Sequence, residues 1–292
     1  MAQVVGFFIV LIVVIGGLLV SGGPAVLSAL PFELGLIGGA ALGTLLIANS
    51  ASVAVDAIKG FGRAIKGPRY DTAAYTSLLI VMFDLSRRAR SGGIVAIEAD
   101  IEAPDQSALF KAHPQIKGDP WAVDLITDSF RLMALDPAAR QRVGDYTDEA
   151  IGAIVDKRQR AVSALVSLSD ALPALGIVAA VLGIIKTMGV IDQSPAILGE
   201  MIAAALLGTF LGVFLAYGLV GPLASRFGQI VEEETHFLDT IRQLLIAFSQ
   251  NVAPRTAIEL ARASLPGHVR PDLQSLDTAL TQSRFPKHQA AA

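Results

Sequence analysis

The residues best suited to chemistry in this chain are the few polar ones inside or beside its apolar segments. Asp170 directly precedes the apolar run 171–191, and Thr209 lies in the middle of the run 201–220. A carboxylate in that position can relay a proton, and a hydroxyl can line an ion path. Both also have structural interpretations, because an Asp near a helix end commonly caps or anchors the helix and a mid-helix Thr commonly bonds to its own backbone. The sequence leaves both interpretations open.

Acidic residues are missing from the middle of the apolar runs. Glu33 and Glu200 are expected at outer helix ends, within reach of solvent. Ionisable residues inside a membrane commonly mark the route of a proton. If this chain passes ions, we therefore expect the main proton-carrying acid to come from another chain.

Apolar residues make up 53% of the 292 residues, and they gather in the runs 4–20, 34–55, 171–191 and 201–220. The last two have about the 20 residues that an α-helix needs to cross the hydrocarbon core of a bilayer. The residues before the first run carry no positive side chain, so this run is predicted to be a retained helix rather than a cleaved signal. The sequence thus predicts an all-α protein with four transmembrane helices.

Lysine and arginine residues are placed unevenly around these runs. They follow the second run, precede the third and follow the fourth, whereas the short link within each pair of runs holds at most Lys186. The positive-inside rule then places the long middle segment and both termini in the cytoplasm. The predicted segments are transmembrane helices 1 and 2 at 1–55, a cytoplasmic helical domain at 56–168, transmembrane helices 3 and 4 at 169–222, and a cytoplasmic C-terminal helix and tail at 223–292.

The charged segments have the apolar periodicity of further helices. A short last helix and a loose tail are expected near the C-terminus. The other predicted helices cover residues 75–90, 95–102 and 120–133, then 146–169 running into the third apolar run, and 230–248 continuing the fourth.

Two of the runs carry small residues at every fourth position, which places them on one helix face. Small side chains let neighbouring backbones approach, either within one subunit or against a partner or another copy. The small residues are Gly35, Gly39, Gly43, Ala204, Gly208, Gly212 and Ala216.

Pro173 and Pro222 lie at the same end of the third and fourth runs. Proline has no N–H to donate to the helix. The two prolines therefore mark either a hinge layer at one membrane depth or two helix ends.

Several function classes are excluded by composition. The chain has no cysteine, and its four histidines lack the spacing of metal ligands. A net charge of −3 with both signs interspersed argues against nucleic-acid binding. The sequence has no HExxH motif, Cys nucleophile or Gly-rich phosphate loop. We therefore predict neither an enzyme nor a bound metal or cofactor.

Three stretches together resemble one protein family. The runs SDALPALGIVAAVLGIIKTMG, LLGTFLGVFLAYGLVGPLA and ARSGGIVAIEADIEAP are similar to the MotA family of flagellar motor stator subunits, within the MotA/TolQ/ExbB proton channel family. The resemblance covers nearly the whole chain and fades after about residue 270. It implies a protein of the bacterial inner membrane that takes part in flagellar rotation and chemotaxis.

The resemblance also implies partners and residue roles. A ring of copies, thought to be five, surrounds a MotB dimer that supplies the membrane Asp taking the proton. Arg90 and Glu98 match the charges that engage the rotor protein FliG. The positions of Asp170 and Thr209 are associated with the ion path in the family. The two prolines of the family match Pro173 and Pro222.

Two questions stay open after the resemblance. Sodium-driven relatives tend to carry Thr where this chain has Ala180, and a methyl group removes an oxygen that could bind sodium, so proton drive is favoured. The alternative function is an ExbB/TolQ-type proton-driven energy transducer, although those proteins have three spans and an outside N-terminus. A membrane-embedded enzyme has less support, because the sequence contains no catalytic constellation. A purely structural scaffold also has less support, because it would leave the mid-membrane Thr209 and the paired prolines unexplained.

Overall fold

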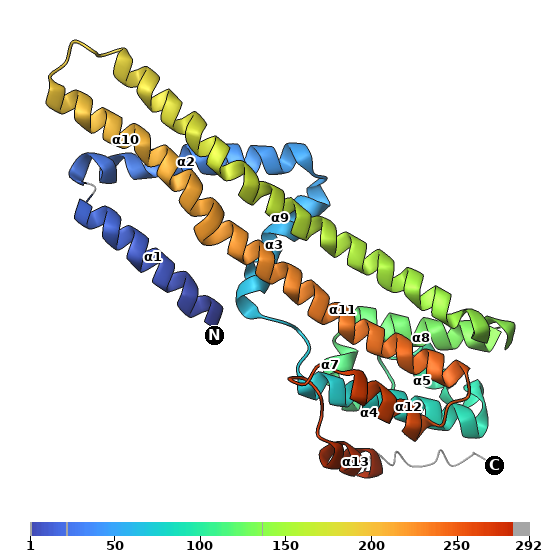
Figure 1. Ribbon diagram of the computed structural model, residues 1–292. Helices are drawn as coiled ribbons and strands as arrows, with labels where there is room; N and C mark the ends of the chain where they lie inside the picture. Colours follow the sequence, from blue (N-terminus) through green and yellow to red (C-terminus); the bar gives the residue numbers. More distant parts are fainter. Residues whose placement is uncertain (1, 22, 136, 283–292) are drawn as a thin grey trace. The chain divides into compact units, whose positions relative to one another are not determined.

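The computed structural model describes residues 2–21, 23–135 and 137–282, which are almost entirely helical and contain no strand. Figure 1 shows the order of the helices along the chain. The chain divides into two compact units. Unit 1 comprises residues 1–67 and 156–231, and unit 2 comprises residues 68–155 and the chain from 232 onward.

Unit 1 contains the apolar helices. Three segments of the described chain are long and apolar enough to cross a membrane, namely Val26–Ala48, Arg140–Met188 and Pro195–Ser249, of which the last two extend from unit 1 into unit 2. Val4–Val20 is a shorter apolar helix. The elements of unit 1 are α1 (Ala2–Ser21), α2 (Gly23–Ala48), α3 (Ala51–Lys66), the second part of α9 (Val143–Met188), α10 (Pro195–Val213), a π-helix (Phe214–Val220) and the first part of α11 (Gly221–Ser249).

The second apolar helix differs from its predicted bounds. The run 34–55 does not form one helix, because α2 begins at Gly23, continues through Pro31 and ends at Ala48. Pro31 lies inside this helix, because helices of this apolar kind tolerate an internal proline when their neighbours satisfy the freed backbone groups. The break after α2 lies at Ser50, whose backbone is extended (φ −64°, ψ 153°) before α3 begins at Ala51.

Unit 2 packs short helices around α4. The apolar face predicted for residues 75–90 is the core of this unit: Leu78, Leu79 and Met82 are fully buried. Gly93, with φ 73°, follows the last residue of α4 in a conformation that side chains other than glycine rarely adopt. The elements are α4 (Thr72–Gly92), a 3₁₀ turn (Ile94–Ile97), α5 (Glu98–Glu102), α6 (Ala108–Ala112), α7 (Pro114–Lys117), α8 (Pro120–Leu135), a 3₁₀ helix (Pro137–Arg142), the remainders of α9 and α11, α12 (Pro254–Ser264) and α13 (Leu273–Gln282).

Several helix predictions are confirmed and others need correction. The helix predicted from 146 to 169 does run unbroken into the third apolar run, as α9. The helix predicted over 95–102 is instead a 3₁₀ turn followed by the five residues of α5. Two short helices, α12 and α13, stand where one was expected, and the tail after residue 282 lies outside the described residues.

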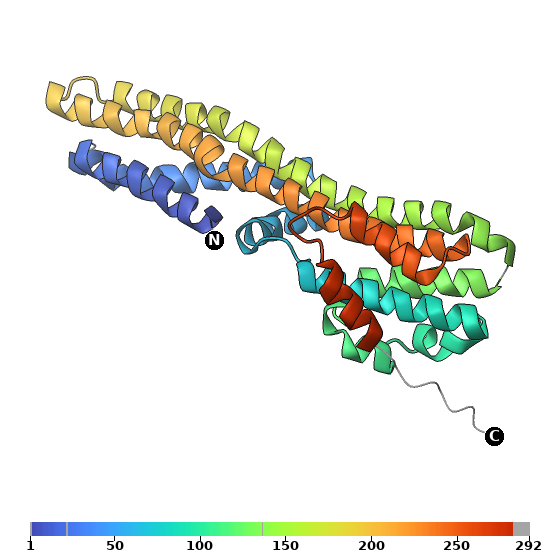
Figure 2. The ribbon, with the colours of Figure 1, turned by 60° about the horizontal axis from the view of Figure 1, so that its bottom comes forward.

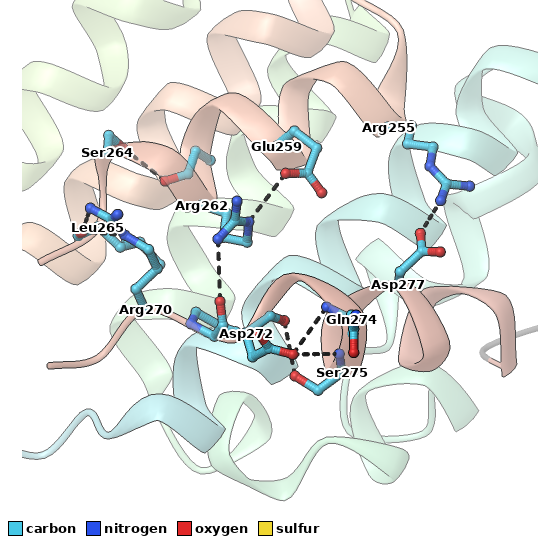
Figure 3. Close-up of polar contacts among 12 residues, drawn as sticks. Arg255, Glu259, Arg262, Ser264, Leu265, Arg270, Asp272, Gln274, Ser275 and Asp277 are labelled. Carbon is cyan, nitrogen blue, oxygen red and sulfur yellow. Dashed lines mark hydrogen bonds and ion pairs between the residues drawn. The ribbon is translucent and has the colours of Figure 1, made fainter. Parts of the chain in front are cut away.

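Polar contacts join α12 and α13 at the C-terminal end of unit 2 (Figure 3). Arg255 of α12 pairs with Asp277 of α13. Arg262 Nη1 donates to the carbonyl of Pro271, which lies between the two helices, at 3.4 Å. Asp272 caps α13 by accepting hydrogen bonds from the backbone N–H groups of Gln274 and Ser275, each at 3.1 Å. These contacts hold α12 and α13 against each other.

A buried polar group ties the start of α4 to the start of α8. Asp119 is fully buried, accepts a hydrogen bond from the hydroxyl of Tyr70, and pairs with Arg69 at 3.2 Å. The Tyr70 ring stacks on Phe237 of α11 with centroids 3.8 Å apart. Burial, followed by the charge of Asp119, raises the pKa of the Tyr70 hydroxyl, so this hydroxyl stays protonated and donates. Asp119 is thus a partnered charge in an apolar core.

Removing this carboxylate is expected to destabilise unit 2 strongly. Asp119→Ala leaves the buried Tyr70 hydroxyl without its acceptor, and breaking such a pair costs about 3 kcal/mol. Chemical denaturation of the detergent-purified protein measures the change in the free energy of unfolding. Asp105→Asn is the matched control, because the Asp105 side chain is 93% exposed and its ion pair with Lys117 is long, at 3.7 Å. Equal stability of the two variants would contradict the structural role of Asp119.

Candidate functional site: a glycine-packed helix pair and a charged surface

The α9 and α10 helices of unit 1 run antiparallel and in close contact (Figures 1 and 2). A Cβ atom added to Gly212 would lie 2.7 Å from the carbonyl oxygen of Leu172 and 2.8 Å from Cα of Gly176. A Cβ added to Gly208 would lie 3.0 Å from the Ala179 Cβ. These positions cannot carry a larger side chain without moving a backbone, so glycine sets the distance between the two helices.

The partner glycines on α9 were missed by the sequence analysis. Gly176 faces Gly212, and a Cβ added to Gly183 would lie 2.6 Å from the Ala205 Cβ. Gly176, Ala179 and Gly183 follow one another at spacings of three and four, which is the spacing of one helix face. This mixed spacing of three and four residues is a weaker sequence signal than the strict four-residue repeats of the other runs.

The contacts between α9 and α10 also fix where the two ion-path candidates lie. Ala179 is opposite Gly208, so Thr209 is level with α9 residues near 178. Asp170 lies about eight residues away from that level, or about 12 Å along the helix axis. The two side chains therefore occupy different depths of one helix pair rather than a shared site.

Neither a helix cap by Asp170 nor a bond from Thr209 to its own preceding turn is found among the described residues. Asp170 is exposed and lies in the interior of α9, so it caps no helix end. Thr44 and Thr187 donate to the carbonyl four residues earlier, at 2.6 and 2.9 Å. Within the described chain the half-buried Thr209 makes no bond of this kind. Both polar groups remain able to interact with an ion or another chain.

Glu33 corrects the expectation that every acid lies at an exposed helix end. It is the eleventh residue of α2 and only 5% exposed. Its Oε2 lies 3.1 Å from the position of a Cβ added to Gly208, and no hydrogen-bond partner for this oxygen exists among the described residues. The expectation is wrong because α2 begins at Gly23, well before the apolar run 34–55, so Glu33 lies inside the helix instead of at its end. Glu200, by contrast, is exposed near the start of α10, as expected.

A cavity of about 490 Å³ adjoins Glu33. Its wall includes Ser28, Lys186 and Glu200 together with small residues of α9 and α10, among them Ala204. The cavity thus combines a buried carboxylate with charged groups that reach solvent.

Pro173 and Pro222 do not lie at one depth. Pro173 is inside α9, close to the contact between Leu172 and Gly212. Pro222 is the second residue of α11 and directly follows the π-helix 214–220. Because the helices are antiparallel, the contact between Ser169 and Ala216 lies between the two prolines. The predicted single hinge layer is therefore wrong; the prolines flank a short stretch of the helix pair.

The small residues of α2 behave differently from those of α10. Gly35 and Gly39 are exposed, and no atom of the described chain lies within 4 Å of a Cβ added to either of them or to Gly43. Ala216, in the π-helix that follows α10, is fully buried. Packing within one subunit therefore accounts for the small residues of α10 but not for those of α2. Contact of the α2 face with another chain stays a prediction.

The two charges singled out in unit 2 have distinct surroundings. Arg90 Nη1 donates to the carbonyls of Asn251 and Val252, at 3.1 and 2.8 Å, in the turn before α12. Glu98 is exposed at the start of α5 and lines a cavity of about 510 Å³ with Val95 and Leu135, which are 78% and 84% exposed. Arg90 thus has a structural bond as well as an exposed position, whereas Glu98 stands beside exposed apolar side chains.

Comparison with known proteins supplies the family. Residues 4–93 match the family described as Motility protein A N-terminal, and residues 123–240 match the MotA/TolQ/ExbB proton channel family. The chain is 32% identical to Motility protein A of Escherichia coli K12 over 289 residues, which cover 99% of this chain and 98% of that protein. The chain belongs to the MotA family of flagellar stator proteins.

Solved structures agree with the MotA fold. C. jejuni MotAB superposes with a TM-score of 0.73 at 16% identity, covering 93% of this chain and 98% of that one. The flagellar MotAB stator complex of Bacillus subtilis superposes with a TM-score of 0.68 at 20% identity, covering 90% and 95%. At these identities the likeness establishes the fold, while the sequence relative establishes the family.

The glycine contacts predict different effects of the same substitution in two helices. Gly212→Val is expected to separate α9 from α10 and to lower the amount of folded protein in the membrane severalfold, because its side chain would overlap backbone atoms of α9. Gly39→Val meets only open space in this chain and should leave the isolated subunit intact. Membrane immunoblots and thermal stability in detergent measure both.

Native gels of the assembled complex add a second readout. Normal stability of Gly39→Val with loss of the oligomer would support the α2 face as a contact with another chain. Normal levels and stability of Gly212→Val would refute the close packing of α9 and α10.

Proposed function

We propose that this chain is a stator subunit of the bacterial flagellar motor that couples an ion current to torque on the rotor. The observation that carries the proposal is the 32% identity with Motility protein A, which extends over 99% of this chain. The glycine-packed helix pair and the polar groups beside it supply a physical basis. The function needs no catalytic residue, so the chain is proposed not to be an enzyme and to need no cofactor.

The proposed placement is in the inner membrane with four spans. The short apolar helix 4–20 is the first proposed span. The Lys and Arg residues that follow the second span, precede the third and follow the fourth support a cytoplasmic location for the segment 56–168 and for both termini. Several copies, in the family ring of five, surround a MotB dimer, and lipid covers the outer apolar side chains. The related complexes contain MotA together with MotB, which supports MotB as the partner.

The proposed ion route follows the helix pair. An ion enters beside Glu33, passes the MotB Asp near Thr209, and leaves past Asp170. Each elementary charge that crosses releases about 2.3 kcal/mol per 100 mV of membrane potential. Ala180, opposite Gly208, offers no side-chain oxygen to a sodium ion, which supports proton drive. Pro173 and Pro222 are the positions at which the helices change shape.

The proposed output lies in unit 2. Glu98 and Arg90 meet oppositely charged residues of the rotor protein FliG. The exposed Val95 and Leu135 beside Glu98 give this contact an apolar part that a solvated charge alone would lack. Exposed ion pairs contribute under about 1 kcal/mol each, which suits contacts that form and break at every step.

The transducer alternative has less support. The match over residues 4–93 is to a segment described for Motility protein A, whereas only the match over residues 123–240 is shared with TolQ and ExbB. A transducer would also leave the Glu98 surface without a rotor to contact.

Deletion of the gene tests the stator function. We expect cells that assemble flagella but do not swim, because the motor lacks its source of torque, and we expect a plasmid copy to restore swimming. Flagellar staining and swimming speed are measured in the same cells, in a strain without a second stator set. Normal swimming with loss of iron-complex uptake or envelope integrity would instead support the transducer.

Charge reversal at Glu98 tests the rotor contact. Glu98→Lys is expected to reduce swarm diameter in soft agar severalfold while the membrane level stays normal, because the side chain is exposed and makes no hydrogen bond or ion pair with the described residues. It is a cleaner test than Arg90, whose guanidinium also bonds the turn before α12. Asp105→Lys is the control, an exposed acid of the same unit away from the cavity. Equal swarming of both variants would remove Glu98 from the rotor contact.

A further inference from the structure

One hydrogen bond joins α9 to the π-helix that follows α10. The hydroxyl of Ser169 donates to the carbonyl oxygen of Ala216 at 3.0 Å. Ser169 is 5% exposed and Ala216 is fully buried, so water does not compete for the bond. Serine in a helix commonly bonds to a carbonyl of its own preceding turn. Here the hydroxyl instead reaches a second helix.

Both ends of this bond lie where a proline disturbs helical hydrogen bonding. Pro173 has no N–H, so the carbonyl of Ser169, four residues earlier, lacks its helical donor. Pro222 likewise provides no donor to the π-helix before it. Within this π-helix the carbonyl of Ala216 accepts from the N–H of Gly221, five residues later, instead of four. π-helical turns of this kind are frequent at functional sites.

Gly221 shows that the space around the bond is restricted. A Cβ added to Gly221 would lie 2.9 Å from the Ala216 carbonyl oxygen and 3.1 Å from the Ser169 hydroxyl oxygen. Any larger residue at this position would push against both partners at once. The bond is thus enclosed by the same backbone that leads into Pro222.

We infer that Ser169 is a positioning residue for the torque-generating step, and that its bond to Ala216 makes the two prolines bend together rather than independently. The inference rests on the proposed stator function. A shape change at Pro173 moves the Ser169 peptide, and the hydroxyl passes that displacement to the π-helix and so to Pro222. Without the bond, each helix would respond to the ion separately.

Substitution of Ser169 gives the first test. Ser169→Ala should lower the torque per stator unit in a bead assay, since loss of one hydrogen bond shifts a two-state ratio about two- to tenfold. Ser169→Thr keeps the hydroxyl and should restore torque. Ser167→Ala, an exposed serine two residues away on α9, is the control and should match the wild type. Gly221→Ala should resemble Ser169→Ala, because it crowds the same bond.

A distance measurement gives a second test that does not require rotation. The chain has no cysteine, so Val166→Cys and Tyr217→Cys, both at exposed positions, take spin labels at defined sites. In the complex with MotB, labelled subunits are diluted with unlabelled ones and pulsed EPR records the distance between the labels. The distribution should be narrow with Ser169 or Ser169→Thr and broader with Ser169→Ala.

Each outcome decides a separate claim. Wild-type torque and a narrow distribution for both Ser169→Ala and Gly221→Ala would overturn the role of Ser169. Failure of the unmodified gene to restore rotation in the deletion strain would refute the stator function instead. In that case the distance distributions still report whether the bond couples the two helices.

Discussion

The close approach of α9 to α10 is the constraint on which unit 1 depends. Glycine lets the backbone of one helix lie against that of the other, with Gly212 against Leu172 and Gly176. In an apolar environment there is little hydrophobic drive to bring helices together, so association relies on packing and on hydrogen bonds between helices. The small residues supply the packing, and Ser169 supplies one such bond.

This packing also decides where polar groups can exist inside apolar helices. The Glu33 carboxylate lies beside Gly208 because a larger residue there would take its place. Thr209 follows directly along α10, and Asp170 lies farther along the pair. Polar groups of three helices thus lie beside this packed backbone, with Glu33 of α2 close to the level of Thr209 and Asp170 about 12 Å away along the helix axis.

Unit 2 is held together by different means. Its core is an ordinary apolar one around α4, crossed by the buried group of Asp119, Tyr70 and Arg69. Arg90 extends this framework, because it bonds the turn before α12. Glu98 stands outside the framework on an exposed surface.

The sequence by itself determined the helical class, the apolar segments and the family. Each of these rests on composition, residue spacing or local sequence motifs, which do not depend on tertiary contacts. The unbroken α9 and the buried face of α4 were predicted correctly from apolar periodicity alone. The tertiary structure decided what depends on contacts between distant residues: the burial of Glu33, the role of Gly176 opposite Gly212, and the bond from Ser169 to Ala216. It also showed that Pro31 continues a helix and that Pro173 and Pro222 lie at different depths. A proline or glycine in the sequence states only which backbone bonds are lost or allowed; the neighbouring helix decides whether the result is an end, a bend or a contact.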